Sequence, residues 1–233
     1  ATTTPSIQRA VDLATSGETV NVGAGTFIED VSINKTLVLN GAGPTNTTVS
    51  GAIGGIGTTL FVTANNVEIK NFKITREGNS AATWNDPNLN SAGVSIIGTS
   101  LTGMNVHDNL IVQNRTGIDI NNSSGHTVRN NVITDNRTGL IFRNQTDNLT
   151  VVENEITNNW TVGVLFLDAS GGSNSPVQTA LNGNFSNNNF SGNWYGQIVD
   201  RQSGGLLPAP GTNLKNFSAN WFGTNAPVVT TAN

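Results

Sequence analysis

The chain has 233 residues and a mass of 24.4 kDa, which is enough for one large domain with a continuous core. Only 11% of the residues are charged, and the net charge of −4 with no basic cluster argues against nucleic acid as a partner. The absence of cysteine excludes disulfides and thiol chemistry, and no apolar run is long enough to span a membrane. The start without Met or a leader is what we expect of a mature or excised segment.

The first part of the chain predicts an end cap followed by short strands. A helix is expected to begin at Thr4 and Pro5 and to end at Gly17, with one apolar face made by Ile7, Ala10, Val11 and Ala14. Because the open end of a solenoid exposes its core, we interpret residues 1–17 as an N-terminal capping helix. Residues 18–75 form the first coils, with strands expected at 19–22, 27–33, 36–39, 47–51 and 59–62.

One unit is repeated three times between Met104 and Leu167, and it predicts the fold. Each copy reads apolar-x-x-Asn-x-apolar-x-x-Asn, then a gap, then Gly-apolar-x-apolar, and the glycines recur about every 22 to 24 residues. A fourth copy lies at 185–196 and a partial one at 217–223. Fixed Asn, Gly and β-branched positions in short alternations predict an all-β solenoid with three short strands per coil, a single-stranded right-handed parallel β-helix.

Three insertions interrupt the repeat without dividing it, so we expect a single β-helix domain over residues 1–233. They are the loops 76–92, 169–180 and 203–212, and the tail 226–233 has lost the pattern. Inward stacks of core residues are expected from the repeat, one made by Ile111, Ile133, Ile156 and Phe190 and the other by Ile120, Phe142 and Phe166.

The opening coils also resemble a known superfamily. The stretches Ser6-Ile-Gln-Arg-Ala-Val11, Gly17-Glu-Thr-Val20, Gly25-Thr-Phe27 and Glu29-Asp-Val-Ser-Ile33 look like the first coils of the pectate-lyase-like, right-handed parallel β-helix superfamily. The resemblance covers nearly the whole chain and implies the fold. It does not select a function, because that superfamily contains lyases, hydrolases, esterases, epimerases, phage spikes and non-catalytic surface proteins.

The catalytic motifs of that superfamily have no counterparts in this chain. Polygalacturonases share Asn-Thr-Asp, Asp-Asp, Gly-His-Gly and Arg-Ile-Lys motifs, whereas here Gly125-His126 is followed by Thr127 and the other three are missing. Pectin methylesterases share the Gly25-Thr-Phe opening, but their catalytic Gln and Asp motifs are absent. No cluster of Asp residues like the calcium ligands of pectate lyases stands out. The resemblance therefore implies the fold and no active site.

Two columns of asparagine are predicted to form ladders along the solenoid. Equivalent residues of successive coils stack about 4.8 Å apart, so each amide can hydrogen bond to the amides above and below it. Asn also tolerates the left-handed backbone of a bend, which is the conformation we expect for these residues. The first column is Asn109, Asn131, Asn154, Asn188 and Asn220, and the second is Asn114, Asn136, Asn159 and Asn193.

The position directly after the second ladder suggests a binding surface. It holds Arg115, Arg137, Trp160 and Trp194 on successive copies, and these residues flank turns, so they are expected to point outward. Large exposed aromatic rings on a chain with 6% aromatic residues suggest a flat platform for sugar rings, with Arg beside it, and we group Trp84 of the first insertion with it. The alternative is that the insertions fold over this column and bury both of its tryptophans.

Charged residues near the Gly-apolar strands are the candidates for catalysis. We expect Asp119, Arg143, Asp168, Asp200 and Arg201 to point outward from neighbouring coils. Two carboxylates about 5 to 9 Å apart can hydrolyse a glycosidic bond, and an Asp–Arg pair can hold a uronate. A surface salt bridge between Asp119 and Arg143 explains the same residues without catalysis.

Other polar residues predict neither a metal site nor glycosylation. His107 and His126 lack a partner at metal-ligand spacing, so we expect no metal and two solvated histidines. No cofactor is required, and calcium is the one ion left open. The Asn-x-Thr sequons at Asn114, Asn136 and Asn159 coincide with a ladder, where a glycan has no room, and this favours a prokaryotic or otherwise unglycosylated origin.

The missing motifs, low charge and Thr- and Asn-rich surface favour a non-catalytic β-solenoid that is secreted or at the cell surface. We expect a structural or adhesive role, a polysaccharide or surface glycan as partner, and a place within a longer surface protein. One alternative is a polysaccharide lyase or glycoside hydrolase with an atypical active site. Another is a self-assembling fibre or matrix subunit, because only the N-terminal end has an evident cap and an open solenoid end can pair with a second copy.

Overall fold

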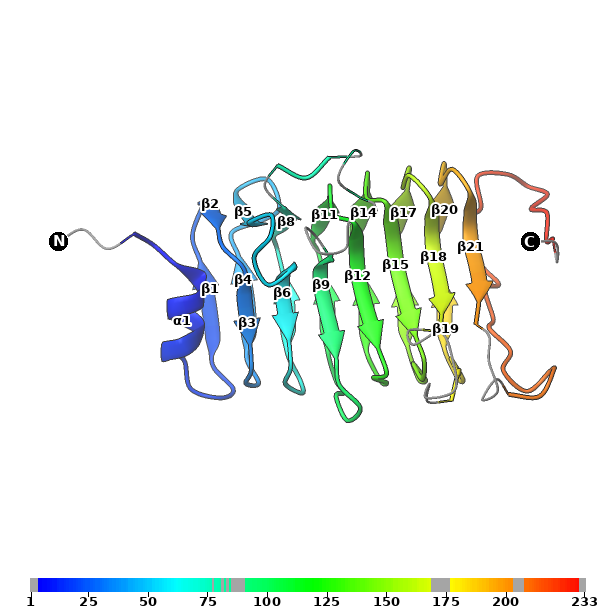
Figure 1. Ribbon diagram of the computed structural model, residues 1–233, viewed down its shortest axis with the longest axis horizontal. Coiled ribbons are helices and arrows are strands. Elements are labelled where there is room, and N and C mark those ends of the chain that lie inside the picture. The colour runs from blue at the N-terminus through cyan, green and yellow to red at the C-terminus, as the bar shows by residue number, and fades with distance from the viewer. Residues whose placement is uncertain are drawn as a thin grey trace.

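In a computed structural model the chain winds into a long row of stacked coils, with the two termini at opposite ends of the row (Figure 1). The structure describes residues 4–76, 78–80, 82, 84, 91–168, 177–202 and 208–230. The expected insertions at 76–92, 169–180 and 203–212 fall partly outside these residues, as does the end of the expected tail.

Three parallel sheets of seven strands form the walls of the described solenoid, and each coil contributes one strand to each wall. Sheet A contains β1 (Thr19–Val22), β4 (Val38–Gly41), β7 (Glu68–Lys70), β10 (Asn105–His107), β13 (Thr127–Arg129), β16 (Thr150–Val152) and β19 (Asn184–Ser186). Sheet B contains β2 (Gly25–Ile28), β5 (Thr47–Gly51), β8 (Lys73–Arg76), β11 (Leu110–Val112), β14 (Val132–Thr134), β17 (Glu155–Thr157) and β20 (Asn189–Ser191). Sheet C contains β3 (Val31–Ile33), β6 (Thr58–Val62), β9 (Ala92–Ile97), β12 (Thr116–Asn121), β15 (Thr138–Arg143), β18 (Val162–Leu167) and β21 (Gly196–Arg201).

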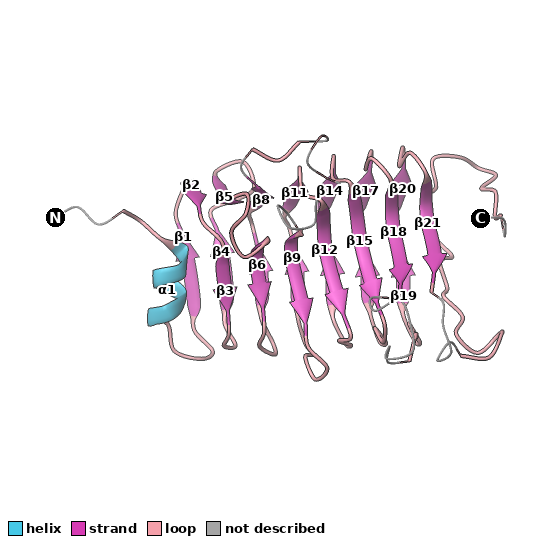
Figure 2. Cartoon of the chain, in the orientation of Figure 1, coloured by secondary structure: helices cyan, strands magenta, loops and turns pink. Residues whose placement is uncertain are grey.

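The strands lie in a register that stacks like residues on like, as the repeat predicts. Ile111 pairs with Ile133, Ile133 with Ile156 and Ile156 with Phe190, and all four side chains are fully buried. Ile120, Phe142 and Phe166 form the second buried stack. Figure 2 shows strands along the coil and a helix at its N-terminal end. The predicted fold class, an all-β right-handed parallel β-helix, is confirmed.

Close contact between the coils explains the glycine in the three regular copies of the repeat. A Cβ atom on Gly139 would lie 2.5 Å from the carbonyl oxygen of Gly163, and one on Gly117 would lie 2.6 Å from that of Gly139. Real Cβ atoms do not approach an oxygen so closely, so any side chain at these positions would push neighbouring strands of sheet C apart.

The N-terminal helix α1 (Ile7–Leu13) covers the first coil, but its boundaries differ from those expected. Ser6, not Thr4, is the N-cap, because its side chain accepts a hydrogen bond from the Arg9 N–H. The Glu29 carboxylate also accepts the backbone N–H groups of Ile7 and Gln8, at 2.6 and 3.1 Å. The helix ends at Leu13, before Gly17, which lies in the following turn.

The C-terminal end of the core is covered as well, although no described helix lies there. The ring of Phe217 stacks on Phe185 with 4.5 Å between centroids, and Phe222 stacks on Phe190 at 5.7 Å. The Lys215 ammonium lies 4.9 Å from the centre of the Phe166 ring. An irregular segment, which the sequence did not mark as a cap, therefore packs against the aromatic face of the last coils.

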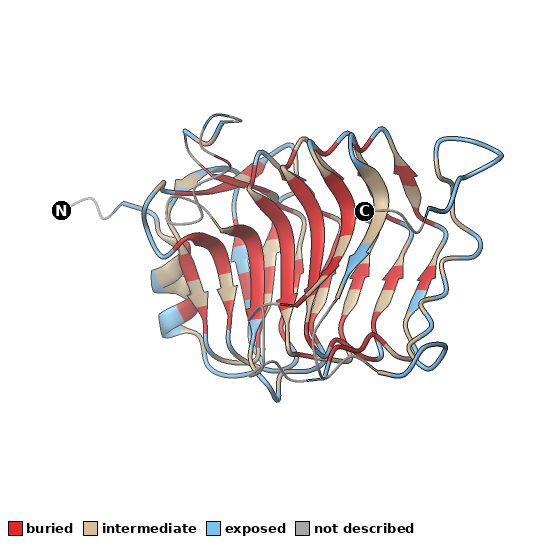
Figure 3. Cartoon of the chain, turned by 45° about the vertical axis from the view of Figure 1, so that its right-hand side comes forward, coloured by how far each residue is buried: buried red, intermediate tan, exposed pale blue. Residues whose placement is uncertain are grey.

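The outward face of sheet C is also unusually buried. Figure 3 shows continuous buried stretches along its strands, where simple alternation would leave every second residue open. The outward side chains of Ser95, Asp119 and Ile141 are 1%, 4% and 3% exposed. The middle of this wall is therefore not an open groove.

Candidate functional site

Both asparagine columns hydrogen bond from coil to coil in the interior. In the first column, the Asn131 Nδ2 donates to Asn154 Oδ1 at 3.0 Å and to the carbonyls of Val106 and Arg129, both at 2.9 Å. The Asn131 Oδ1 accepts both the backbone N–H and the side-chain amide of Asn109. The second column repeats this pattern, so the ladders shape two corners of the coil.

The ladder residues do not have the left-handed backbone that we expected of them. Positive φ angles occur instead at the residue before each ladder position, for example 57° at Asp108, 51° at Asn130 and 51° at Asp135. The residue that precedes each ladder asparagine therefore makes the bend in the backbone. This bend directs the asparagine side chain inward, where its N–H groups donate to backbone carbonyls of the strands.

The platform column lies at the corner between sheets B and C. Arg137, Trp160 and Trp194 follow ladder residues on successive coils, and the backbone N–H of each donates to a ladder carbonyl of the previous coil. The side chain of Trp160 is 52% exposed and that of Trp194 is 81% exposed. Both tryptophans therefore present surface to solvent.

Trp84 lies behind this surface instead of on it. Its ring is 4% exposed and meets the Trp160 ring edge to face, with 5.1 Å between centroids and 89° between planes. The Nε–H of Arg115 donates to the Trp84 carbonyl at 3.0 Å, and the Trp160 Nε1–H donates to Asp135 Oδ1 at 3.0 Å. Our grouping of Trp84 with the exposed rings is corrected: it supports Trp160, whose orientation is set by these contacts.

An exposed ring that sequence reasoning missed adjoins the column. Tyr195 follows Trp194 directly and is 64% exposed, and its backbone N–H donates to the Thr161 carbonyl of the previous coil at 2.7 Å. The signal was present in the fourth copy as the pair Trp194-Tyr195. We call Arg137, Trp160, Trp194 and Tyr195 the corner platform.

The catalytic candidates do not come together as one open site. The Arg143 Nε lies 2.9 and 3.1 Å from the two carboxylate oxygens of Asp119. Burial raises the pKa of the Asp119 carboxyl, and the neighbouring charge of Arg143 works in the opposite direction. Because Asp119 is only 4% exposed and both oxygens contact Arg143, it is a buried ion pair partner and not a surface group.

The other three candidates are scattered. Asp168 is buried, with 8% of its surface exposed, so it does not face solvent as expected. Asp200 is exposed, as expected, although it is in register with the inward-facing Phe166, and its carboxylate contacts the Lys215 ammonium at 2.8 Å. Arg201 lies on the outward column of Arg143 and is exposed, two strands further along sheet C.

Both histidines are buried, which corrects the expectation of solvated side chains. His107 is 5% exposed, and its ring nitrogens contact Asp108 at 2.5 Å and Glu68 at 3.2 Å. His126 is 1% exposed, and burial lowers its pKa to about 4. The apolar pattern of the repeat did not predict this burial, because His107 is at an outward position of the coil and His126 is in a turn.

His126 is hydrogen bonded to Ser123, but the pair is not arranged as a nucleophile and its base. The Met104 backbone N–H donates to His126 Nδ1 at 3.2 Å, so the proton of the neutral ring sits on Nε2. That Nε2–H then donates to Ser123 Oγ, whose hydroxyl donates to the Leu101 carbonyl at 3.1 Å. His126 cannot accept the serine proton in this arrangement, and the pair instead ties two turns together.

These walls, ladders and exposed corner rings define a β-helical repeat protein with a surface platform. The chain belongs to the family described as periplasmic copper-binding protein (NosD), whose model matches residues 11–203. No curated protein matches the chain. No helix among the described residues is long and apolar enough to cross a membrane.

Solved structures similar to the chain share its fold at low sequence identity. Geobacillus virus E2 ORF18 is 16% identical, with a TM-score of 0.52 over 86% of this chain and 46% of its own. Pectin methylesterase PemA of Erwinia chrysanthemi is 12% identical, with a TM-score of 0.52 over 92% of this chain and 88% of its own. An alginate lyase of Paenibacillus sp. is 15% identical, with a TM-score of 0.53 over 84% and 71%. The chain thus spans about half the length of the first.

The side chains of this protein do not fit the copper site that the family description implies. Copper favours imidazole, thiolate and thioether ligands. The chain has no Cys, one Met and two His, and all three of those residues are described. Met104 is 1% exposed, and every ring nitrogen of His107 and His126 contacts a group of the protein. The described residues contain no cluster of three or more His, Asp or Glu arranged to hold a metal.

Proposed function

We propose that this protein is a non-catalytic binding module that holds a linear glycan on the corner platform outside the cytoplasm. The observation that carries the proposal is the exposure of Trp160 and Trp194, 52% and 81%, at equivalent positions of neighbouring coils. Large rings that remain open to solvent on a chain with few aromatic residues are suited to stack against the apolar faces of sugars.

The geometry supports a ligand that runs along the solenoid axis. Neighbouring coils are separated by about 4.8 Å, close to the length of one sugar ring, so a chain of sugars meets one platform position after another. Trp160 is held by Trp84 and Asp135, so it loses little side-chain freedom on binding. Each stacked ring contributes about 0.5 to 1.5 kcal/mol, which predicts weak binding that grows with ligand length.

The location and the lack of turnover are part of the same proposal. The family description names the periplasm, which supports a place outside the cytoplasm. The buried Asp119–Arg143 pair and the ion pair of Asp200 with Lys215 support binding without catalysis. Calcium is not needed for stacking, and a glycan-holding module of this kind fits a role within a longer surface protein.

The test is binding of long neutral and acidic polysaccharides, measured by affinity electrophoresis and calorimetry. Trp160→Ala with Trp194→Ala should weaken binding about tenfold or more, because both stacking faces are lost. Trp221→Ala is the matched control, since Trp221 is 46% exposed but lies on sheet B, paired with Asn189. Equal loss in the control would show that the platform has no special role.

A parallel assay distinguishes binding from catalysis. Each polysaccharide is incubated with the protein, with and without calcium, and reducing ends and unsaturated products are measured. We expect neither product. Product formation that disappears in Asp119→Asn or Arg143→Ala would contradict the proposal and would establish a lyase or hydrolase with an atypical site.

A further inference from the structure

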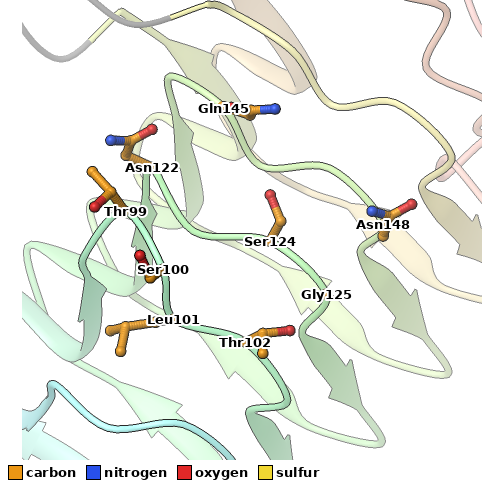
Figure 4. Close-up of a pocket in the computed structure, with 9 residues that line it drawn as sticks. All are labelled: Thr99, Ser100, Leu101, Thr102, Asn122, Ser124, Gly125, Gln145 and Asn148. Atoms are coloured by element: carbon orange, nitrogen blue, oxygen red, sulfur yellow. The ribbon is translucent and has the colours of Figure 1, made fainter.

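A second concavity lies at the opposite end of the sheet C strands, where the chain turns towards sheet A. Turns of three successive coils form it, and its volume is about 260 Å³. Figure 4 shows the residues that line it. The first turn supplies Thr99, Ser100 and Thr102, the second supplies Asn122 and Ser124, and the third supplies Gln145. We call this the turn pocket.

The chemistry of the turn pocket is polar and uncharged. Its lining consists of hydroxyls, amides, the Gly125 backbone and one apolar side chain, Leu101, without Lys, Arg, Asp or Glu. Within the described structure, the hydroxyls of Thr99, Ser100 and Thr102 and the side-chain amide of Asn122 make no hydrogen bond to protein. The pocket therefore offers several donors and acceptors at close range to a ligand that carries the same kind of groups.

The backbone below these groups is held in place before any ligand binds. The Gly125 N–H donates to the Asp147 carbonyl at 2.8 Å, and the Gly103 N–H donates to the Gly125 carbonyl at 3.1 Å. The buried Ser123–His126 pair joins the second turn to the first from inside, through hydrogen bonds to the backbone of Leu101 and Met104. This gives the buried histidine a role: it keeps the turn pocket in shape.

Gly125 keeps the pocket open. Its φ angle is +72°, and a Cβ atom there would lie 2.6 Å from the Thr102 Oγ1, one of the free hydroxyls. Any side chain would therefore take the space that a ligand atom needs next to Thr102.

We propose that the turn pocket binds one neutral sugar unit through its hydroxyl groups. A ring of hydroxyl and amide partners with a single leucine matches a pyranose, which has hydroxyls at its edge and an apolar face. A uronate or phosphate is disfavoured because no cation lines the pocket to compensate for the cost of burying a charge. The proposal does not rest on the corner platform, because a six-residue strand of about 20 Å separates the two sites.

The experiment is a titration of the whole isotope-labelled chain with neutral monosaccharides, namely glucose, galactose, mannose and xylose, followed by amide NMR. At least one sugar should produce saturable shifts of the Gly125 and Asn122 amides, whereas glucuronate should not. Thr102→Val with Asn122→Gly should weaken that binding at least tenfold. Glycine suits position 122, where φ is 52°, and both residues are at the surface, so the fold is retained.

Two controls complete the test. Thr134→Val makes the same hydroxyl-to-methyl change on the outward face of sheet B and should leave affinity unchanged. Trp160→Ala with Trp194→Ala should also leave it unchanged, so failure of the platform proposal and failure of this one are distinguished. The proposal is overturned if no neutral sugar shifts these amides, if glucuronate binds equally well, or if the pocket variant binds like the parent.

Discussion

Replacing Asn131 by Ala tests whether the asparagine ladders hold the solenoid together. The sequence alone suggests the loss of one rung, worth about 1 to 2 kcal/mol. The structure raises that figure, because the two N–H groups of Asn131 Nδ2 are shared among three oxygen acceptors and its Oδ1 accepts two further hydrogen bonds. Without them the buried backbone N–H of Asn109 loses its partner in a site that is 1% exposed.

At about 0.5 to 1.5 kcal/mol for each bond, with neighbouring bonds not fully additive, the expected loss of unfolding free energy is about 3 to 5 kcal/mol. Chemical denaturation followed by circular dichroism measures it. Asn184→Ala is the control, because Asn184 is exposed and its side chain bonds only Ser186; its effect should stay within about 0.5 kcal/mol. A loss below about 1 kcal/mol in Asn131→Ala would refute the reasoning, since it would show that the amide is replaced at no cost.

Three further outcomes are expected. Phe142→Ala should lower the unfolding free energy by about 3 to 5 kcal/mol, because Phe142 is fully buried with Phe166 at 5.3 Å; denaturation that matches the parent would contradict the packing. Because burial lowers the pKa of His126 from 6.5 to about 4, only the unfolded chain binds its proton between these values. The free energy of unfolding should therefore be highest above pH 6.5 and should fall by about 3 kcal/mol by pH 4. The His126→Gln variant should not show this dependence on pH. Equimolar copper should leave the melting temperature unchanged, and a rise of several degrees would reveal a site.

Much of the solenoid could be predicted because repetition gives each position the same surroundings in every coil. The isoleucine at 111 has to face inward if those at 133 and 156 do, since a slip by one residue would turn every side chain of the strand to the other face. The ladder positions follow from the same register. The sequence showed that glycine recurs in the repeat. It did not show that the carbonyl oxygen of the next coil lies too close to leave room for a Cβ atom.

The outward side chains were harder to place, because their surroundings depend on segments outside the repeat. Whether Asp119 is open or covered cannot be read from its strand, and alternation alone made it exposed when it is 4% exposed. Asp200 is in register with the inward-facing Phe166, yet it is exposed, because its strand is the last one of sheet C. Trp84 lies far in sequence from Trp160, and only the folded chain brings the two rings into contact.

The sequence by itself thus determined the period, the inward stacks and the ladders, which depend on contacts between neighbouring copies. Tertiary structure alone decided which rings stay exposed, which carboxylates are buried, and that three turns enclose the turn pocket. The physical reason is the range of the interactions. Backbone pairing between coils repeats at a fixed spacing and is encoded locally, whereas burial of a surface residue depends on where distant loops come to rest.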